Sequence, residues 1–234
     1  MKKLHWTLLS LFILFFACGT NEKLEELESE NQEMLQKLEM EKSEILKKME
    51  KLNADLAFYE KADIKLNFLS AKMKNLKARI VTNHGDIEVS FLPYKAPIHC
   101  FAFIERSLNG FYDNTTFHRV MADFMIQGGD PNSKDKDPNN DGMGAPLLAI
   151  PHEFNTTKHV PGVLSMARVS DTRMGAGSQF FIMHGTKSHL DGQYTAFGKV
   201  LKGMEVVDAI AQVETNERNR PLKPVVIKTI EIIQ

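Results

Sequence analysis

The sequence has few cysteines, and its charge is nearly balanced. The two cysteines, Cys18 and Cys100, are too few for a disulfide framework. A formal net charge of -1 gives no electrostatic case for nucleic acid as a partner, because there is no basic stripe to neutralise phosphates. The histidines are scattered, and the HExxH spacing of a zinc site does not occur, so we expect no metal site.

The chain is long enough for one core and one additional segment. It has 234 residues, of which 43% are hydrophobic and 25% are charged. A chain of this size and composition can bury one sizeable hydrophobic core. The sequence patterns then divide it into residues 1–17, 18–77 and 78–234.

The N-terminus has the pattern of a targeting segment. Residues 1–3 form a short basic region, and residues 8–17 form an apolar run too short to span a bilayer comfortably. The following Ala-Cys resembles the lipobox of bacterial lipoproteins, in which the cysteine is lipidated. We predict a signal peptide over residues 1–17, lipidation of Cys18, and attachment to a membrane in the bacterial cell envelope, outside the cytoplasm. Ordinary cleavage or an uncleaved anchor is the alternative. With Cys18 lipidated, Cys100 is expected to be a small core residue on a helix.

The stretch from Thr20 to His84 contains neither glycine nor proline, and Glu, Lys and Leu dominate it, as in a long helix. With Leu24 at heptad position a, an apolar seam runs along the stretch and drifts by one position in its middle part. The a positions are Leu24, Asn31, Leu38, Ile45, Leu52, Tyr59, Leu66 and Met73, and the apolar d positions are Leu27, Met34, Ala62, Leu69 and Leu76. We predict a stalk over residues 18–77 that forms a coiled-coil homo-oligomer of two or three chains through residues 21–77. A single solvated helix acting as a spacer is the alternative.

From Lys77 onward the pattern changes from helical to β. Two alternating runs flank Asn83-His84-Gly85, which predicts a hairpin turn. Further short strands are predicted at residues 116–121, 124–127, 163–167, 178–183, 195–200 and 225–233, with helical patterns at residues 97–108 and 204–213. Many short strands with glycine turns and only two helices predict a β-barrel capped by helices. Side chains fill a barrel of this size, so a ligand must bind at its outer face or rim.

The first of these two helices has apolar residues spaced three and four apart. Pro97 suits its first turn, and Asn109-Gly110 ends it. The spacing predicts that Ile98, Phe101, Ile104 and Leu108 lie on its apolar face, together with Glu105.

Residues 130–144 are rich in Asp, Asn, Lys and Gly. Oxygen-bearing side chains alternate at Asp135, Asp137, Asn139 and Asp141, as in a calcium loop. The glycine is misplaced, and no glutamate closes the loop at its twelfth position. We therefore predict an ordinary solvated surface loop here.

The stretch Phe117–Asp130, FHRVMADFMIQGGD, carries two long polar side chains, Arg119 and Gln127, among apolar residues. By itself, an arginine in a strand is typical of an exposed surface. This stretch, together with GVLSMAR, GSQFFI and HLDGQYTAFGKV, resembles the cyclophilin family of peptidyl-prolyl cis-trans isomerases in its bacterial form. The resemblance covers residues 79–234, and the motifs follow the family's order.

This resemblance implies a fold, an activity and a substrate class. The implied fold is a closed eight-stranded antiparallel β-barrel capped by two helices and preceded here by the long helix. The implied activity is peptidyl-prolyl isomerisation without a cofactor or a metal. With the targeting segment, it implies that the partners are proline-containing peptides and unfolded exported proteins.

The resemblance also assigns site residues. It places the catalytic role on Arg119, Gln127 and Phe181. It places substrate binding on Phe124, Met125, Ala167, Arg168, Gln179, His189, Leu190 and Tyr194. His189 stands where the best-known eukaryotic members have tryptophan, and Tyr194 where they have histidine, so tight cyclosporin binding is not implied.

The residue types suit this chemistry. Rotation about an X-Pro bond crosses a barrier of about 18–20 kcal/mol, because the amide is stabilised by resonance. In the twisted transition state the proline nitrogen regains a lone pair, to which an arginine can donate a hydrogen bond that the planar ground state cannot accept. The alternative function is a peptide-binding or oligomerising scaffold, but the presence of Arg119, Gln127 and Phe181 favours an enzyme.

Overall fold

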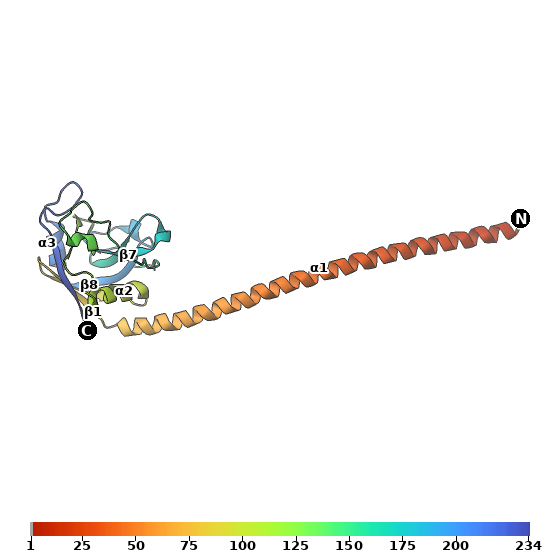
Figure 1. Cartoon of the computed structure of the whole chain (residues 1–234), viewed down its shortest axis with the longest axis horizontal. Helices are drawn as coiled ribbons and strands as arrows, with labels where there is room; N and C mark the ends of the chain where they lie inside the picture. Colours follow the sequence, from red (N-terminus) through yellow and green to blue (C-terminus); the bar gives the residue numbers. More distant parts are fainter. Residues whose placement is uncertain (1) are drawn as a thin grey trace. The chain divides into compact units, whose positions relative to one another are not determined.

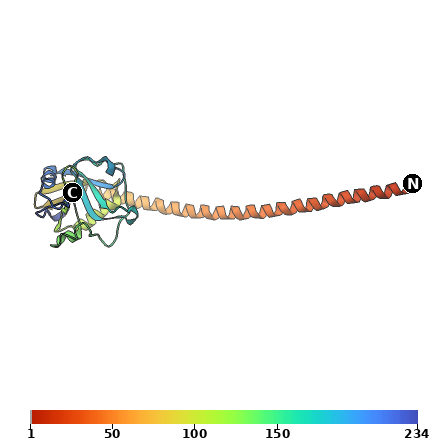
Figure 2. The same cartoon turned by 90° about the horizontal axis from the view of Figure 1, so that it is seen from above.

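The structure is a computed structural model that describes the backbone of residues 2–234 and the side chains of residues 23, 27–53 and 63–234. Its first element is the continuous helix α1, Lys2–Met73 (Figures 1 and 2). The predicted lipidation site, Cys18, lies outside the residues whose side chains are described. In the part of the chain that the structure describes, no helix carries an apolar stretch long enough to cross a membrane.

The chain divides into two compact units, residues 1–62 and residues 63–234, so the last turns of α1 belong to the second unit. In these turns Met73 is buried, and Leu69 packs against the core of the second unit, as does Leu76 just after the helix. The Ser70 hydroxyl donates a hydrogen bond of 2.7 Å to the Pro93 carbonyl. Leu69, Met73 and Leu76 are positions of the predicted coiled-coil seam, and their partners here lie within their own chain.

The second unit is built on one antiparallel sheet of nine strands, in the order β3-β9-β1-β2-β8-β6-β7-β5-β4. The strands are β1 Lys77–Thr82, β2 Asp86–Phe91, β3 Thr115–Thr116, β4 Arg119–Met121, β5 Met125–Gly128, β6 Val163–Arg168, β7 Ala176–Met183, β8 Thr195–Lys202 and β9 Val226–Ile233. The last strand pairs with the first, Lys77 opposite Ile233, so the C-terminus lies beside β1 (Figure 1). The predicted hairpin at Asn83-His84-Gly85 is present between β1 and β2.

The sheet does not close, so the prediction of a closed eight-stranded barrel is wrong. Strands β3 and β4 stand at the two ends of the strand order and are not paired with each other. The predicted strand over residues 116–121 is interrupted at Phe117-His118. At this gap in the sheet, β4 bonds to a loop and not to another strand: the Val120 amide donates a hydrogen bond of 2.8 Å to the Asn219 carbonyl. The architecture is therefore an open antiparallel half-barrel.

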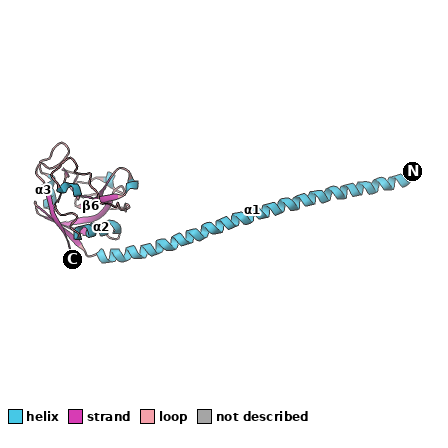
Figure 3. Cartoon of the chain, in the orientation of Figure 1, coloured by secondary structure: helices cyan, strands magenta, loops and turns pink. Residues whose placement is uncertain are grey.

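Two helices, α2 Pro97–Leu108 and α3 Met204–Ala211, accompany the sheet (Figure 3). Three short 3-10 turns, Pro131–Lys134, Thr172–Met174 and Ser188–Leu190, lie in the connections. Helix α2 begins at Pro97 as predicted and ends before Asn109-Gly110, where Gly110 adopts a positive φ of 68°.

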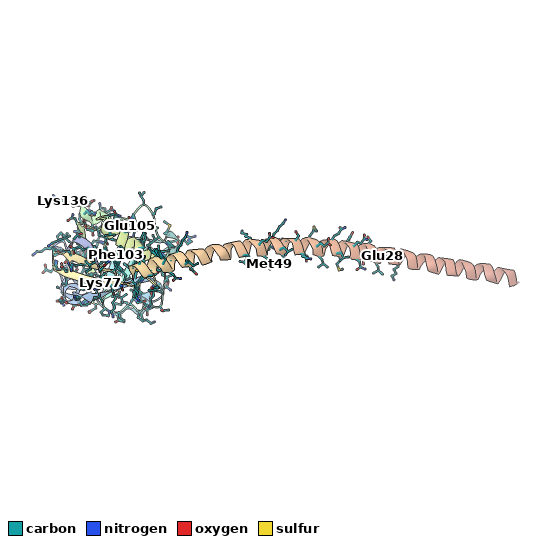
Figure 4. The ribbon with its side chains drawn as sticks, turned by 90° about the horizontal axis from the view of Figure 1, so that it is seen from below. Glu28, Met49, Lys77, Phe103, Glu105 and Lys136 are labelled. Atoms are coloured by element: carbon teal, nitrogen blue, oxygen red, sulfur yellow. The ribbon has the colours of Figure 1, made fainter. Side chains whose placement is uncertain are left out.

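The buried face of α2 differs from the predicted one. Ile104 is buried as predicted, but the other buried apolar residues are Cys100 and Phe103, whereas Phe101 and Leu108 are exposed. Apolar residues on both faces of α2 are spaced three and four apart. The aromatic rings that surround Phe103 (labelled in Figure 4) determine which face is buried. Its ring centroid lies 5.1–5.9 Å from those of Tyr112, Phe180, Phe197 and Phe91. Cys100 is a core residue on a helix, as predicted, and burial raises the pKa of its thiol to about 12.

The first turn of α2 is capped by a residue from a distant loop. The N-cap residue, Ala96, has no side-chain acceptor for the free amides of the first turn. The Glu153 carboxylate accepts them instead, from Ile98 N and His99 N at 2.9 Å each, and also contacts His99 Nδ1 at 2.6 Å. The position of α2 therefore depends on the loop that carries Glu153.

Candidate active site

Arg119 and Gln127 are cross-strand partners in the antiparallel pair β4–β5. Opposite residues of such a pair lie on the same face of a sheet. Arg119 Nη1 donates a hydrogen bond of 3.3 Å to Gln127 Oε1, and Nη2 lies 3.3 Å from the sulfur of Met121. Arg119 is exposed and Gln127 is half-buried. The sheet thus places a guanidinium, with donors to spare, on its outer face.

The side chain of Gln127 belongs to a chain of hydrogen bonds that ends in a buried carboxylate. Gln127 Nε2 donates to Gln179 Oε1 at 3.0 Å, and Gln179 Nε2 donates to the carbonyls of Gly142 and Gly144 at 2.9 and 3.0 Å. The amides of these two glycines donate to the carboxylate of Asp130, which is fully buried. Asp130 therefore fixes the loop that orients Gln179, a role that the sequence patterns do not reveal.

Beside Arg119 lies a cavity of about 140 Å³, for which this chain brings together side chains from five segments. Drug-sized ligands occupy pockets of roughly 300–1,000 Å³, so this one fits a single side chain. All of its lining residues are predicted site residues: Arg119, Phe124, Met125, Gln127, Ala167, Arg168, Phe181, Leu190 and Tyr194. We call it the proline pocket.

The floor of the proline pocket is apolar and buried. Met125, Phe181 and Leu190 are only 2–4% exposed and belong to one packed cluster. Phe124 and Tyr194 are half-buried at its edge. The rings of Phe181 and Tyr194 meet edge to face, with centroids 5.7 Å apart. The result is an apolar slot with two arginine side chains, Arg119 and Arg168, among its lining residues.

Two predicted site residues, Gln179 and His189, do not line the proline pocket. Gln179 stands behind Gln127, as described above. His189 is exposed, and its ring centroid lies 6.5 Å from that of Phe124. Arg168 lines the pocket with its side chain, and its guanidinium carbon lies 4.6 Å from the centre of the Tyr194 ring.

The comparisons with known proteins agree with this geometry. Residues 77–232 match the family model described as cyclophilin type peptidyl-prolyl cis-trans isomerase/CLD. The chain belongs to the cyclophilin family. The predicted family and its enzyme class, peptidyl-prolyl cis-trans isomerase, are thereby confirmed for this part of the chain.

Similar cyclophilins occur in distant organisms. Peptidyl-prolyl cis-trans isomerase-like 2 of Rhizopus delemar is 41% identical over 169 residues, which cover 70% of this chain and 30% of that protein. Peptidyl-prolyl cis-trans isomerase A of Dickeya dadantii is 39% identical over 165 residues, which cover 66% of this chain and 83% of that protein. The chain thus spans less than a third of the fungal relative's length. A fungal and a bacterial relative at similar identity do not single out the bacterial form.

A solved structure shares the fold. The cyclophilin type isomerase of Cryptosporidium parvum, crystallised in the presence of the dipeptide Ala-Pro, aligns with a TM-score of 0.62 at 32% identity. The alignment covers 68% of this chain and 99% of that one. It supports a cyclophilin-like half-barrel with helices.

Behind the proline pocket of this cyclophilin domain lies a buried histidine that the sequence patterns did not point to. His159 Nδ1 lies 3.1 Å from the Asp191 carboxylate, Nε2 lies 3.1 Å from the Ser165 hydroxyl, and the ring stacks near Phe181 with centroids 6.2 Å apart. Burial lowers the pKa of His159. The pKa of Asp191 is lowered to about 2, chiefly because its carboxylate accepts the His159 backbone N–H. His159 thus supports Phe181 from behind.

The carboxylates of Asp135, Asp137 and Asp141 already have partners within the protein. Asp135 accepts the amide of Asp137 at 2.7 Å, and Asp137 accepts the amide of Asn139 at 3.0 Å, as in Asx turns. Asp141 is paired with Arg220. Among the side chains that the structure describes, no three ligating groups gather where a metal ion could bind.

Proposed function

We propose that this chain catalyses cis-trans isomerisation of X-Pro bonds in exported proteins, with Arg119 donating a hydrogen bond to the proline nitrogen in the twisted transition state. One observation carries the proposal. A guanidinium held by Gln127 stands at the rim of an apolar pocket of the size of one side chain.

The chemistry follows from what changes during rotation. The planar amide nitrogen offers no lone pair, whereas the twisted nitrogen does, so a donor beside it stabilises the transition state selectively. Donors already in place need no reorganisation when the charge distribution changes. The bonds from Arg119 to Gln127 and from Gln127 to Gln179 provide this arrangement.

The apolar floor has a different role in this proposal. Met125, Phe181 and Leu190 hold the proline ring while the preceding carbonyl swings past it. Ala167 and Arg168, on β6, border the pocket on the side that the family resemblance assigns to the residues before the proline. No covalent intermediate forms in this mechanism.

The test is an exchange assay on an X-Pro peptide with the purified chain. We expect Arg119→Ala to lower kcat/KM about 100-fold or more, the usual cost of losing one transition-state donor, and to leave the melting temperature unchanged because Arg119 is exposed. Arg79→Ala is the matched control, since Arg79 is also a partly exposed strand arginine, paired with Glu231. Equal activity of wild type and Arg119→Ala would contradict the arginine mechanism. Inactivity of both would favour the scaffold function.

We also propose that Cys18 is lipidated after removal of residues 1–17 and holds the domain outside the cytoplasm at a membrane of the bacterial cell envelope. The basic residues 1–3, the apolar run 8–17 and the Ala-Cys pair support this proposal. A Cys18→Ser variant is expected to leave the membrane fraction. Its continued partition into membranes would contradict lipidation.

For helix α1 we propose a coiled coil of two or three chains that ends before residue 63. Apolar seam residues Leu38, Ile45 and Leu52 are exposed within the chain, whereas Leu69, Met73 and Leu76 pack against the core of their own domain. Sedimentation of the chain should show an oligomer that Ile45→Glu dissociates, with Glu44→Gln as a control off the seam. A strictly monomeric wild-type chain at high concentration would overturn this proposal.

A further inference from the structure

Three cavities of the cyclophilin domain meet at Gln127. The first is the proline pocket. The second, of about 320 Å³, includes Ala167, Arg168 and Gln179, and the third, of about 670 Å³, includes Arg119 and Arg218. Gln127 lines all three. We call the third the arginine cavity.

The walls that the cavities share give their order along the groove. The proline pocket shares Ala167 and Arg168 with the second cavity but shares Arg119 with the arginine cavity. The two larger cavities also share Gly142 and Met143 with each other, so the three cavities surround Gln127, and each of the larger ones borders the proline pocket through a different arginine. In a substrate peptide, the residues before the proline would lie along Ala167 and Arg168. The residues after the proline would then run past Arg119 towards the arginine cavity.

Cationic side chains exceed anionic ones in the arginine cavity. Three arginines line it, and the carboxylates are those of Asp141 and Glu217. Asp141 is already paired with Arg220, Nε to Oδ2 at 2.5 Å. Within the described side chains, Arg119 and Arg218 make no ion pair at all. Their charges are available to a ligand.

Arg218 is presented by a fixed turn. Asn216 Oδ1 accepts the backbone amides of Arg218 and Arg220 at 2.9 and 3.1 Å. The Asn219 carbonyl accepts the amide of Val120 on β4, so the turn is held against the strand that carries Arg119. The backbone of this turn is thus positioned by bonds at both of its ends.

The cavity also contains a buried polar side chain without a partner. His118 is only 6% exposed, lines the arginine cavity, and has no hydrogen bond to either ring nitrogen among the described residues. Burial lowers the pKa of His118. Neither ring nitrogen is accessible from the cavity, so the His118 ring forms part of its wall, and the charge offered to a ligand is that of the arginines.

We propose that the arginine cavity binds an acidic side chain of the substrate, within the three residues that follow the proline, and so makes the enzyme selective for acidic sequences there. The inference rests on the proposed isomerase function and deepens it. Arg218 supplies the pairing charge, and Glu217 beside it opposes the ligand. Both residues are exposed, so the preference is modest and depends on salt.

The experiment compares peptides that differ only in carrying Glu, Gln or Lys at one of the three positions after the proline. Their Kd values are measured by calorimetry and their exchange rates by NMR with the full chain. At low salt we expect the Glu peptide to bind about three- to fivefold more tightly than the Gln peptide at one position, the range of an exposed ion pair. The Lys peptide should bind more weakly, and salt should reduce both differences.

Substitutions then assign the preference to the cavity. Arg218→Gln should remove the advantage of the Glu peptide, Glu217→Gln should increase it, and Arg79→Gln should leave it as in wild type. Equal Kd values for Glu and Gln peptides at all three positions would overturn the inference. Preferential binding of the Glu peptide without faster cis-trans exchange would support the acidic-side-chain site and count against the Arg119 mechanism. A failure of the inference can therefore be told from a failure of the proposed isomerase function.

Discussion

The middle of helix α1 and its C-terminal end use apolar side chains in opposite ways. Over residues 27–53 every side chain is exposed, including Leu38 and Met49, which stands free of the ribbon in Figure 4. Between Asp63 and Met73, by contrast, Leu69 and Met73 pack onto the core of the sheet domain. The same heptad repeat runs through both stretches. The repeat alone therefore does not show whether an apolar residue packs against its own chain or against another chain.

Truncating a buried and an exposed apolar residue of the same helix should give the largest difference in the free energy of unfolding in α2. We expect Phe103→Ala to lower the free energy of unfolding by about 3–5 kcal/mol, because it leaves a cavity among four rings. Phe101→Ala, two residues away and half exposed, should cost less than about 1 kcal/mol. Urea unfolding of both variants checks this. Similar costs would show that Phe103 is not the centre of the core.

Met73 and Met49 test the same contrast within α1. Met73 is 3% exposed and Met49 is 55% exposed. Met73→Ala should cost about 2–4 kcal/mol of domain stability, whereas Met49→Ala should stay within about 0.5 kcal/mol when measured on the domain's unfolding transition. A small effect of Met73→Ala would place the last turns of the helix outside the folding unit of the domain.

Acid should affect the sheet domain through Asp191. The folded-state pKa of Asp191, about 2, lies below the usual value of roughly 3.9 for an unfolded chain. The carboxylate therefore stabilises the fold above about pH 4, and its contribution is lost as the pH falls towards 2. Asp191→Asn should lower the melting temperature at pH 6 and flatten its decline below pH 4. An unchanged profile in the variant would remove Asp191 from the acid transition.

The strands could be predicted from the sequence because their signals are local, and the residues of the proline pocket could be predicted because four short motifs resemble one family. Alternation, glycine turns and the FHRVMADFMIQGGD motif lie within short stretches, and all nine residues that line the proline pocket were among the predicted site residues. The errors concern contacts between distant segments. The open seam depends on Val120 meeting Asn219, and the buried face of α2 depends on the rings around Phe103.

The supporting residues of the site were not predicted for the same reason. Asp130 acts through two glycines of its own loop, and His159 meets Asp191 across 32 residues of chain. Both are buried polar groups that need hydrogen-bond partners, and the spacing of residues in the sequence does not indicate which residues these partners are.

The capping of α2 by Glu153 has a consequence for the order of folding. The helix lacks an acceptor of its own at Ala96, and its first amides are satisfied by a carboxylate 54 or 55 residues further along the chain. A loop of that length must close before the first turn is stabilised, which is an entropic cost met late in folding. We expect φ-values near zero for Glu153→Gln, so this helix start should be among the first parts of the domain to open during unfolding.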